Sequence, residues 1–330
     1  MIEVDRLTKR YGLITAVDRV TFAVGRGEIV GLLGPNGAGK STTMRILTTY
    51  LPPTSGRARL AGFDVLDDPL EVRRHVGYLP ENVPLYGEMR VREYLRFRAR
   101  LKDVPRSRRS VAIDEVVERC RLEEVEDRII GQLSRGFRQR VGLAESMLHD
   151  PDILILDEPT SGLDPLQVRE VRSLLRELGD RHTLLLSTHI MSEVEAVCGR
   201  VIIIASGRIA LDDRLERLKT DPTVVIEARG PAEAVRTALA SEPTIASARI
   251  LAREDGYVTI EVKARDGVDA REAASARIVQ NGWGLLRLEQ RRATLEDRFV
   301  QAVSAAALAA ENDSPAGSEP APDDAELEAV

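Results

Sequence analysis

Short apolar runs alternate with glycine- and proline-containing turns in the first part of the chain. Residues 41–49 have the spacing of an amphipathic helix and follow a glycine-rich loop. Several runs have the length and composition that are typical of β-strands: residues 2–4, 20–24, 28–33, 57–60 and 76–80. The pattern therefore predicts a β-rich N-terminal part that contains one helix.

Helical spacing dominates the next part of the chain. Residues 88–101 and 111–120 are predicted helices, and a third helix follows the N-cap candidate Ser134. We expect a helical insert at about 84–148 within an α/β unit. The first of these helices bears several arginines, which either face a membrane partner or, as we favour, form a solvated face: Arg90, Arg92, Arg96, Arg98 and Arg100.

Two later strands are apolar throughout. Residues 152–158 and 183–187 read as central parallel strands that are buried on both faces, with a helix at 165–178 between them. Asp157 and Glu158 end the first strand, and His189 follows the second. Because ligands of such sheets bind at the carboxyl ends of the strands, these side chains are candidates for one site.

The last third of the chain has a different pattern. From residue 223 the order is strand, helix, strand, strand, helix, strand, which is the ferredoxin-like order, and residues 294–308 form a closing helix. Proline, serine, glycine and acidic residues then dominate. We expect three parts: an α/β domain at 1–218, a small α+β domain at 219–308 and a disordered acidic tail at 309–330.

Composition and charge exclude several classes of protein. The net charge is −6, but seven acidic residues and no Lys or Arg lie in 311–330, so the remaining chain is close to neutral. We therefore expect no nucleic acid as partner. The two cysteines have no C-x-x-C spacing, and no signal-peptide pattern or membrane-length apolar run is found. These features predict a cytoplasmic chain with reduced thiols.

The loop before the first helix fits the phosphate-binding pattern G-x-x-x-x-G-K-[ST] at every fixed position. Glycines permit close backbone approach, and the helix N-terminus attracts anions. Lys40 is placed to contact the outer phosphates and Ser41 to ligate Mg²⁺. The predicted phosphate cradle consists of Gly34, Pro35, Asn36, Gly37, Ala38, Gly39, Lys40, Ser41 and Thr42.

A second helix N-terminus offers another anion site. Ser134 and Gly136 begin the helix that follows Leu133. One monomer rarely needs two such sites for a single nucleotide, whereas two copies facing each other would use both. Asp164 is a candidate N-cap for the helix at 165–178.

The phosphate loop, the L-S-x-G helix start, the strand followed by Asp-Glu, the S-G-L-D turn and the strand followed by Thr-His together resemble the nucleotide-binding subunit of ABC transporters. The resemblance covers about residues 1–215 and implies a P-loop fold of ABC type, in which two cassettes close head-to-tail over ATP and Mg²⁺. It implies that Ser134 and Gly136 contact the γ-phosphate held by the other copy, and that Asp164 communicates across the dimer.

The same resemblance gives roles to the remaining residues. Glu158 resembles the residue that polarises the attacking water, Asp157 the Mg²⁺-organising carboxylate and His189 the γ-phosphate switch. Tyr11 resembles the adenine-stacking aromatic, although its position alone favours an edge-of-core tyrosine. Glu81 stands where a glutamine is usual, and it can still reach Mg²⁺.

Two departures from the commonest pattern suggest a subgroup. Glu81 is one, and Arg135 with Phe137 in the L-S-x-G segment is the other. Both resemble the cassettes of ABC-2-type exporters, as does the segment at 294–300. The implied partners are an ABC-2-type transmembrane permease and a second cassette, with the chain peripheral on the inner face of the membrane. Two alternatives are a soluble ABC-type ATPase acting on ribosomes or DNA and a non-hydrolysing regulatory cassette.

Overall fold

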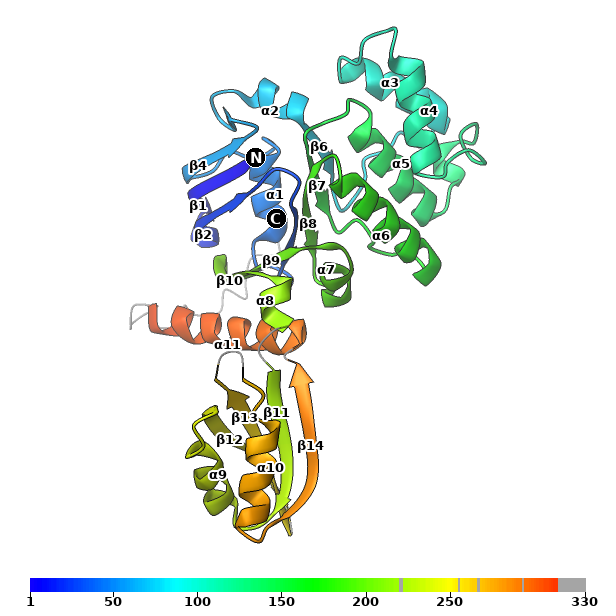
Figure 1. The fold of residues 1–330 in the computed structure, drawn as a ribbon. Helices are drawn as coiled ribbons and strands as arrows, with labels where there is room; N and C mark the ends of the chain where they lie inside the picture. The colour runs from blue at the N-terminus through cyan, green and yellow to red at the C-terminus, as the bar shows by residue number, and fades with distance from the viewer. Residues whose placement is uncertain (220–221, 255, 266–267, 293, 314–330) are drawn as a thin grey trace, which may run out of the picture.

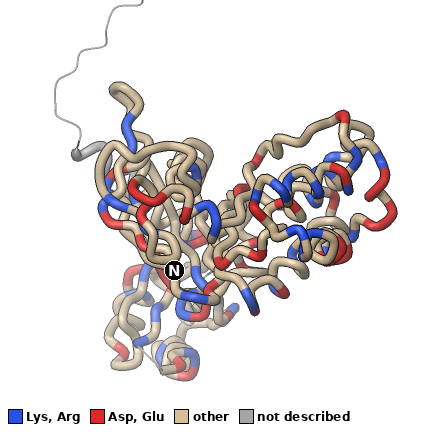
Figure 2. The backbone as a smooth tube through the Cα atoms, turned by 90° about the horizontal axis from the view of Figure 1, so that it is seen from above, with Lys and Arg blue, Asp and Glu red and all other residues tan. Residues whose placement is uncertain are grey.

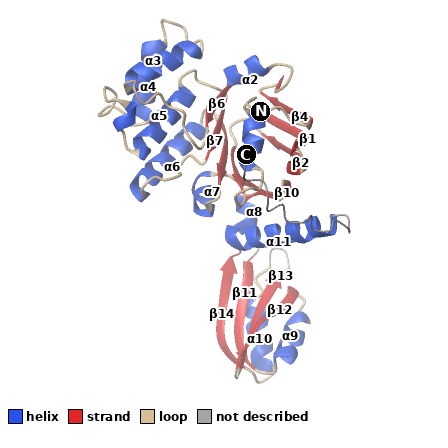
Figure 3. Cartoon of the chain, turned by 180° about the vertical axis from the view of Figure 1, so that it is seen from behind, coloured by secondary structure: helices blue, strands red, loops and turns tan. Residues whose placement is uncertain are grey.

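The computed structural model describes residues 1–219, 222–254, 256–265, 268–292 and 294–313. Within them the strands form three separate sheets, each with its own helices (Figures 1 and 3). Within the described residues, Lys and Arg are interspersed with Asp and Glu along the backbone (Figure 2). Among the described residues, no helix is both long enough and apolar enough to cross a bilayer.

The six-stranded sheet forms the centre of the molecule. Its order is β10-β9-β3-β8-β7-β6, and all neighbours are parallel except β10 and β9. Strand β7 is buried along its whole length, as its continuous apolarity predicts. The strands are β3 (Ile29–Leu33), β6 (Val76–Leu79), β7 (Ile153–Asp157), β8 (Thr183–Thr188), β9 (Arg200–Ala205) and β10 (Arg208–Arg214).

The two faces of this sheet pack against different layers. Ile153 and Ile155 of β7 join the core shared with α1 (Lys40–Leu47) and the N-terminal sheet. Leu154 and Leu156 point to the other face and join the core of the helical insert. Because side chains alternate along the strand, β7 contributes to both cores of this α/β unit.

The N-terminal sheet is antiparallel and has the order β2-β1-β4-β5. Its strands are β1 (Ile2–Tyr11), β2 (Ile14–Val24), β4 (Ser55–Leu60) and β5 (Phe63–Asp64). The first two are longer than the sequence predicts, because bulges interrupt their pairing and shift the alternation of buried and exposed positions. Arg6 and Arg19 lie at these irregularities with positive φ angles of 47° and 50°.

The helical insert packs on the opposite face of the central sheet. Arginines of α3 make contacts within the insert: Arg92 pairs with Asp114 and Glu126, and Arg98 pairs with Glu145. Its helices, with those that flank the sheet, are α2 (Pro69–His75), α3 (Val91–Leu101), α4 (Arg109–Arg119), α5 (Arg135–Met147), α6 (Pro165–Gly179) and α7 (Met191–Val197), with a 3₁₀ turn at Ile130–Gln132.

The third sheet has the order β12-β13-β11-β14 and is antiparallel throughout. With α9 (Ala232–Ala240) and α10 (Arg271–Gln280) it forms the predicted ferredoxin-like arrangement around a separate apolar core. Its strands are β11 (Pro222–Arg229), β12 (Ile245–Glu254), β13 (Tyr257–Ala264) and β14 (Gly284–Arg292).

Helix α11 (Leu295–Asp313) returns to the central sheet. Leu295 and Phe299 pack in one cluster with Val201 of β9 and with Leu215 of α8 (Leu215–Lys219). Figure 1 shows α11 crossing between the central unit and the third sheet. From the sequence we predicted that this helix ends at residue 308 and that a disordered tail begins at 309. The prediction is wrong for residues 309–313, because they continue the helix. Residues 314–330 of the predicted tail lie outside the described residues.

Candidate functional site

The phosphate loop joins β3 to α1. A Cβ at Gly34 would lie 2.4 Å from the carbonyl oxygen of Ile204, and one at Gly39 would lie 2.5 Å from that of Ala16. Gly39 also has a φ of 105° and forms the N-cap of α1. Because both positions exclude a side chain, the loop lies against the sheet and its backbone forms the anion cradle expected at a helix N-terminus.

Lys40 is the first residue of α1 and its side chain is folded back over the loop. Its Nζ donates to the carbonyl oxygens of Gly34 at 2.8 Å and Pro35 at 3.2 Å. Burial lowers the pKa of Lys40, and the negative charges of Glu158, Asp157 and Glu81 oppose this shift. A buried ammonium group that donates to two carbonyl oxygens can exchange these partners for phosphate oxygens, which form stronger charge-assisted hydrogen bonds.

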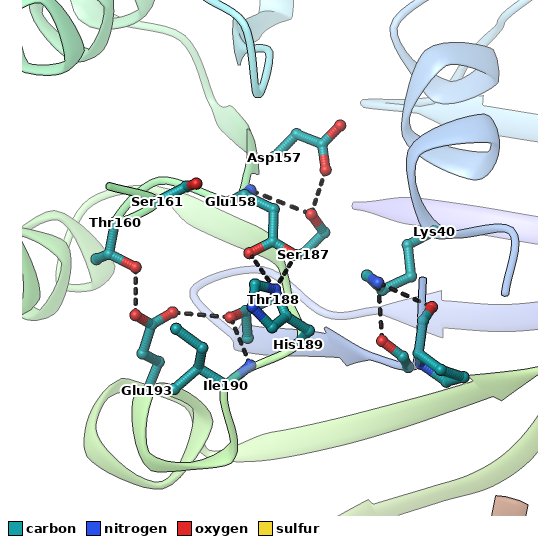
Figure 4. A network of polar contacts seen from close by, with 12 residues as sticks. Lys40, Asp157, Glu158, Thr160, Ser161, Ser187, Thr188, His189, Ile190 and Glu193 are labelled. Atoms are coloured by element: carbon teal, nitrogen blue, oxygen red, sulfur yellow. Dashed lines mark hydrogen bonds and ion pairs between the residues drawn. The ribbon is translucent and has the colours of Figure 1, made fainter. Parts of the chain in front are cut away.

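Asp157 ends β7 and is buried against two hydroxyl groups (Figure 4). Ser41 Oγ donates to Asp157 Oδ1 at 3.3 Å, and Ser187 Oγ donates to the same oxygen. Among the described residues, no group of three or more His, Cys, Asp or Glu side chains is placed to hold a metal ion. One carboxylate with one hydroxyl suits Mg²⁺, which keeps waters and binds phosphate oxygens as its other ligands.

Glu158 follows β7 in a left-handed conformation, with a φ of 50°. Its N–H donates to Ser187 O at 3.1 Å and lies 3.2 Å from Ser187 Oγ. Burial raises the pKa of the carboxyl group, while the hydrogen bond and charge of His189 and the charge of Lys40 oppose this shift. A non-glycine residue in this conformation is uncommon, and here it directs Glu158 away from Asp157 into the site.

His189 follows β8 and contacts Glu158 directly (Figure 4). Its Nδ1 lies 3.0 Å from both carboxylate oxygens of Glu158. Since an ionised carboxylate only accepts hydrogen bonds, Nδ1 is the donor in this contact, and Nε2 has no hydrogen-bond partner among the described residues. The ring is about half exposed, with 52% of its side chain accessible. The imidazole therefore orients the carboxylate and presents a second ring nitrogen to a ligand.

A support network that the sequence analysis did not identify lies beneath these residues. Thr188 Oγ1 donates to Glu193 Oε2 at 2.8 Å, and Thr160 Oγ1 donates to Glu193 Oε1. Glu193 lies on α7 and is buried. It joins the segment after Glu158 to the segment before His189. The sequence does hint at Ser187, since it is a polar residue at the end of an apolar strand. It gives no hint of Glu193, because Thr160 is 33 residues away and Thr188 lies on a different element.

The predicted second anion site lies at the start of α5. Ser134 is exposed and caps the helix by accepting from Phe137 N–H at 3.3 Å. A Cβ at Gly136 would lie 2.3 Å from Oε1 of Gln167, so α5 packs closely on the start of α6. Asp164 caps α6 and accepts from Gln167 N–H at 2.9 Å, as predicted for an N-cap residue.

Tyr11 and Glu81 lie at the margins of the site. Tyr11 ends β1 with its side chain partly exposed, and Lys9 Nζ lies 5.3 Å from the centre of its ring. Glu81 is exposed after β6 and contributes to the electrostatic environment of Lys40. The structure thus gathers Lys40, Ser41, Asp157, Glu158 and His189, whereas Ser134 caps α5 and Gly136 packs against α6.

The fold and this site define a P-loop nucleotide-binding protein of the class with paired carboxylates after one central strand. Comparison with known proteins makes the identification more specific. Residues 17–161 match the sequence profile of the family described as "ABC transporter". An uncharacterized ABC transporter ATP-binding protein, YxlF of Bacillus subtilis, is 35% identical over 305 residues, which cover 92% of this chain and 100% of that protein.

Other relatives agree. The bacitracin transport ATP-binding protein BcrA of Bacillus licheniformis is 32% identical and covers 92% of this chain and 97% of its own length. A solved ATP-binding subunit of an ABC transporter superposes with a TM-score of 0.62 at 32% identity, over 66% of this chain and 92% of that one. The chain belongs to the ABC transporter ATP-binding proteins, and it is the ATP-binding subunit of such a transporter.

Proposed function

We propose that the chain hydrolyses ATP to ADP and phosphate at the interface between two cassettes, and that this drives export through a separate ABC-2-type permease. The observation that supports hydrolysis is the pairing of Glu158 with His189 beside Lys40. Glu158 is the general base that polarises water, because burial raises its pKa toward the range where a carboxylate accepts protons efficiently.

The protein's own residues divide the work of phosphoryl transfer. Lys40 neutralises charge on the outer phosphates, and the loop N–H groups fix their position. Asp157, Ser41 and Glu81 would hold Mg²⁺, which supplies positive charge at the phosphates when bound. His189 keeps Glu158 oriented and offers Nε2 to the γ-phosphate, and Tyr11 stacks on the adenine. This assignment uses every residue that the central site brings together.

A second cassette completes each site. Ser134 is exposed at the start of α5 and has no contact with the phosphate loop of its own chain in the hydrogen bonds of the described residues. An exposed helix N-terminus is suited to contact a phosphate bound by another copy. One solved relative is a dimeric cassette in a post-hydrolysis state with ADP and Pi, at 25% identity and a TM-score of 0.61. We infer that this chain pairs in the same way, with an identical or a related cassette.

We place the permease at a groove between α2 and α3. The groove has a volume of about 850 Å³ and is bordered by the segment that follows Glu81, including Asn82 and Val83. Exposed apolar side chains at its edge, Leu70 and Leu101, lie among basic ones, Arg73 and Arg74. This combination fits an amphipathic segment of the permease that bears acidic residues. Ligand-dependent movement of Glu81 would then reach the permease directly.

Export is the direction that the relatives support. BcrA is named for bacitracin transport, and a relative in Paraburkholderia xenovorans is named for Nod factor export, at 40% identity over 63% of this chain. Binding to a permease would hold the chain on the cytoplasmic face of the membrane. This proposal also predicts that no nucleic acid is needed for activity.

ATPase measurements on the purified full chain test the proposal. We expect ATP-dependent phosphate release that Lys40→Ala abolishes and that ribosomes or DNA do not stimulate. A chain that binds ATP without releasing phosphate, alone and with its permease, would favour a regulatory cassette. For the groove, Arg73→Glu with Arg74→Glu should abolish co-purification with the permease, whereas Arg169→Glu on the exposed face of α6 should not. Retention of the permease by the double variant would exclude this docking surface.

A further inference from the structure

Arg135 is the first residue of α5, between the two signature residues Ser134 and Gly136. Its side chain is exposed and lies across the loop before α6. Arg135 Nη2 donates to Ser161 Oγ at 3.3 Å. A Cβ at Gly162 would lie 2.4 Å from Arg135 Cζ, so the guanidinium group occupies the space that a side chain at Gly162 would need.

The contacted loop leads directly to the proposed general base. Ser161 N–H donates to the carbonyl oxygen of Glu158 at 3.0 Å, and Figure 4 shows Ser161 beside Glu158. Gly162 has a φ of 71°, a conformation that favours glycine and fixes the turn toward Asp164. Two hydrogen bonds therefore join the start of α5 to the backbone of Glu158.

Other contacts hold the same two helices together. Gly136 packs against the side chain of Gln167, and Arg140 of α5 pairs with Glu170 of α6. The Arg140 side chain is nearly buried, with 11% of its surface accessible. The signature segment and the start of α6 are thus closely packed, and Arg135 is the contact that extends this unit to the loop after Glu158.

The charge of Arg135 needs an explanation. A cation in the first turn of a helix opposes the helix dipole, so this arginine does not stabilise α5 electrostatically. What it gains is the contact with Ser161 and Gly162. In a pair of cassettes, Ser134 and Gly136 serve the ATP of the other copy, whereas Glu158 serves the ATP of its own.

We propose that Arg135 is a positioning residue that couples the two ATP sites of the dimer, by tying the segment that contacts one ATP to the loop that holds Glu158 at the other. The inference rests on the proposed two-cassette ATPase. It makes occupancy of one site change the position of the general base in the other, and hydrolysis is therefore cooperative in ATP.

The test is the dependence of the initial ATPase rate on ATP concentration, measured with the full chain as a dimer. We expect a Hill coefficient of about 2 for the unaltered chain, the limit for two sites, and about 1 for Arg135→Ala and for Ser161→Ala. Arg135→Lys keeps the charge but loses the planar donor and should behave like Arg135→Ala. The variant that combines Arg135→Ala with Ser161→Ala should have the same Hill coefficient and the same ATPase rate as either single variant. Arg169→Ala, an exposed arginine of α6, is the matched control.

Several results would overturn the coupling role of Arg135. A Hill coefficient unchanged by Arg135→Ala, or a rise only in the half-saturating ATP concentration, overturns the coupling role and points to a direct phosphate contact. Independent, additive effects of Arg135→Ala and Ser161→Ala also overturn it. A non-cooperative but Lys40-dependent ATPase overturns this inference alone, whereas a chain with no ATPase activity overturns the proposed function as well. Circular dichroism of each variant excludes misfolding, and Ser161→Ala serves if Arg135→Ala does not fold.

Discussion

The imidazole Nδ1 of His189 lies 3.0 Å from each of the two carboxylate oxygens of Glu158. The two residues follow neighbouring parallel strands, β8 and β7, at the same edge of the sheet. The contact orients the carboxylate, whose oxygens keep further lone pairs that can accept hydrogen bonds from water. The hydrogen bond and charge of His189 also oppose the rise in the pKa of Glu158 that burial causes.

Glu158→Gln should retain ATP binding but lose hydrolysis, by about 10²–10⁴-fold, because the amide cannot accept a proton from water. Dimers with trapped ATP should accumulate. Phosphate release and size-exclusion chromatography with ATP measure the two effects. Glu195→Gln, an exposed position on α7, is the control. Turnover near that of the unaltered chain would remove Glu158 from the role of general base.

His189→Ala should move the acidic limb of the kcat profile to higher pH. Burial raises the pKa of Glu158, and His189 opposes that rise. Activity requires the ionised carboxylate, so activity falls as pH drops through this pKa. Without His189 the pKa rises further and the loss begins at higher pH. His189→Gln, which keeps a donor, should shift the limb less. An acidic limb at the same pH in all three proteins would contradict the coupling.

Gly77→Ala should destabilise the fold, on the order of 3 kcal/mol, because a Cβ there would lie 2.2 Å from the carbonyl oxygen of Ser146 in α5. Backbone at this distance cannot rotate away. Gly87→Ala is the matched control, since the nearest atom to its Cβ would be 3.8 Å away. Urea denaturation monitored by circular dichroism compares the two variants. Equal midpoints would show that α5 can move away from β6.

His149 should make the fold less stable in acid. Burial lowers the pKa of His149 to about 3, from an ordinary value of 6.5, and its Nε2 lies 3.1 Å from the carbonyl oxygen of Val76. The unfolded chain takes up a proton below pH 6.5 but the folded chain does not. Stability is therefore full above that pH and falls as pH drops toward 3.

His149→Gln should remove this part of the pH dependence, because Gln does not titrate and can still donate to Val76. Each pKa unit corresponds to about 1.4 kcal/mol, so the difference between pH 7 and pH 4 should shrink by a few kcal/mol. Urea midpoints of both proteins at the two pH values measure it. A variant that loses as much stability in acid as the unaltered chain would place the dependence on other groups.

Local sequence signals predicted the central strands, the phosphate loop and the order of the third sheet. In each case the signal is contained in a few neighbouring residues, such as the apolar run that ends at Asp157. The lengths of β1 and β2 were not predictable, because bulges at Arg6 and Arg19 break the alternation on which strand prediction depends. The helix α2, which has a single buried residue, Val72, also gave too weak a pattern.

In the site, too, some features could be predicted from local sequence and others could not. The types and order of Lys40, Asp157 and Glu158 could be predicted, since each follows a recognisable strand or loop. The contacts of Glu193 with Thr160 and Thr188, and that of Arg135 with Ser161, join residues that are distant in sequence or on different elements. Such contacts depend on how α5, α6 and α7 pack, which no local pattern reports.

Helix α11 covers an apolar strip on the central unit, with Leu295 and Phe299 packed beside Leu215 and Val201. The third sheet is therefore anchored to the ATP-binding unit at both of its chain ends. In a shortened protein that stops after α8, this apolar strip would be exposed to solvent, and the protein would tend to self-associate. Studies of the isolated cassette should keep the chain through Asp313, or replace the apolar residues of the strip with polar ones.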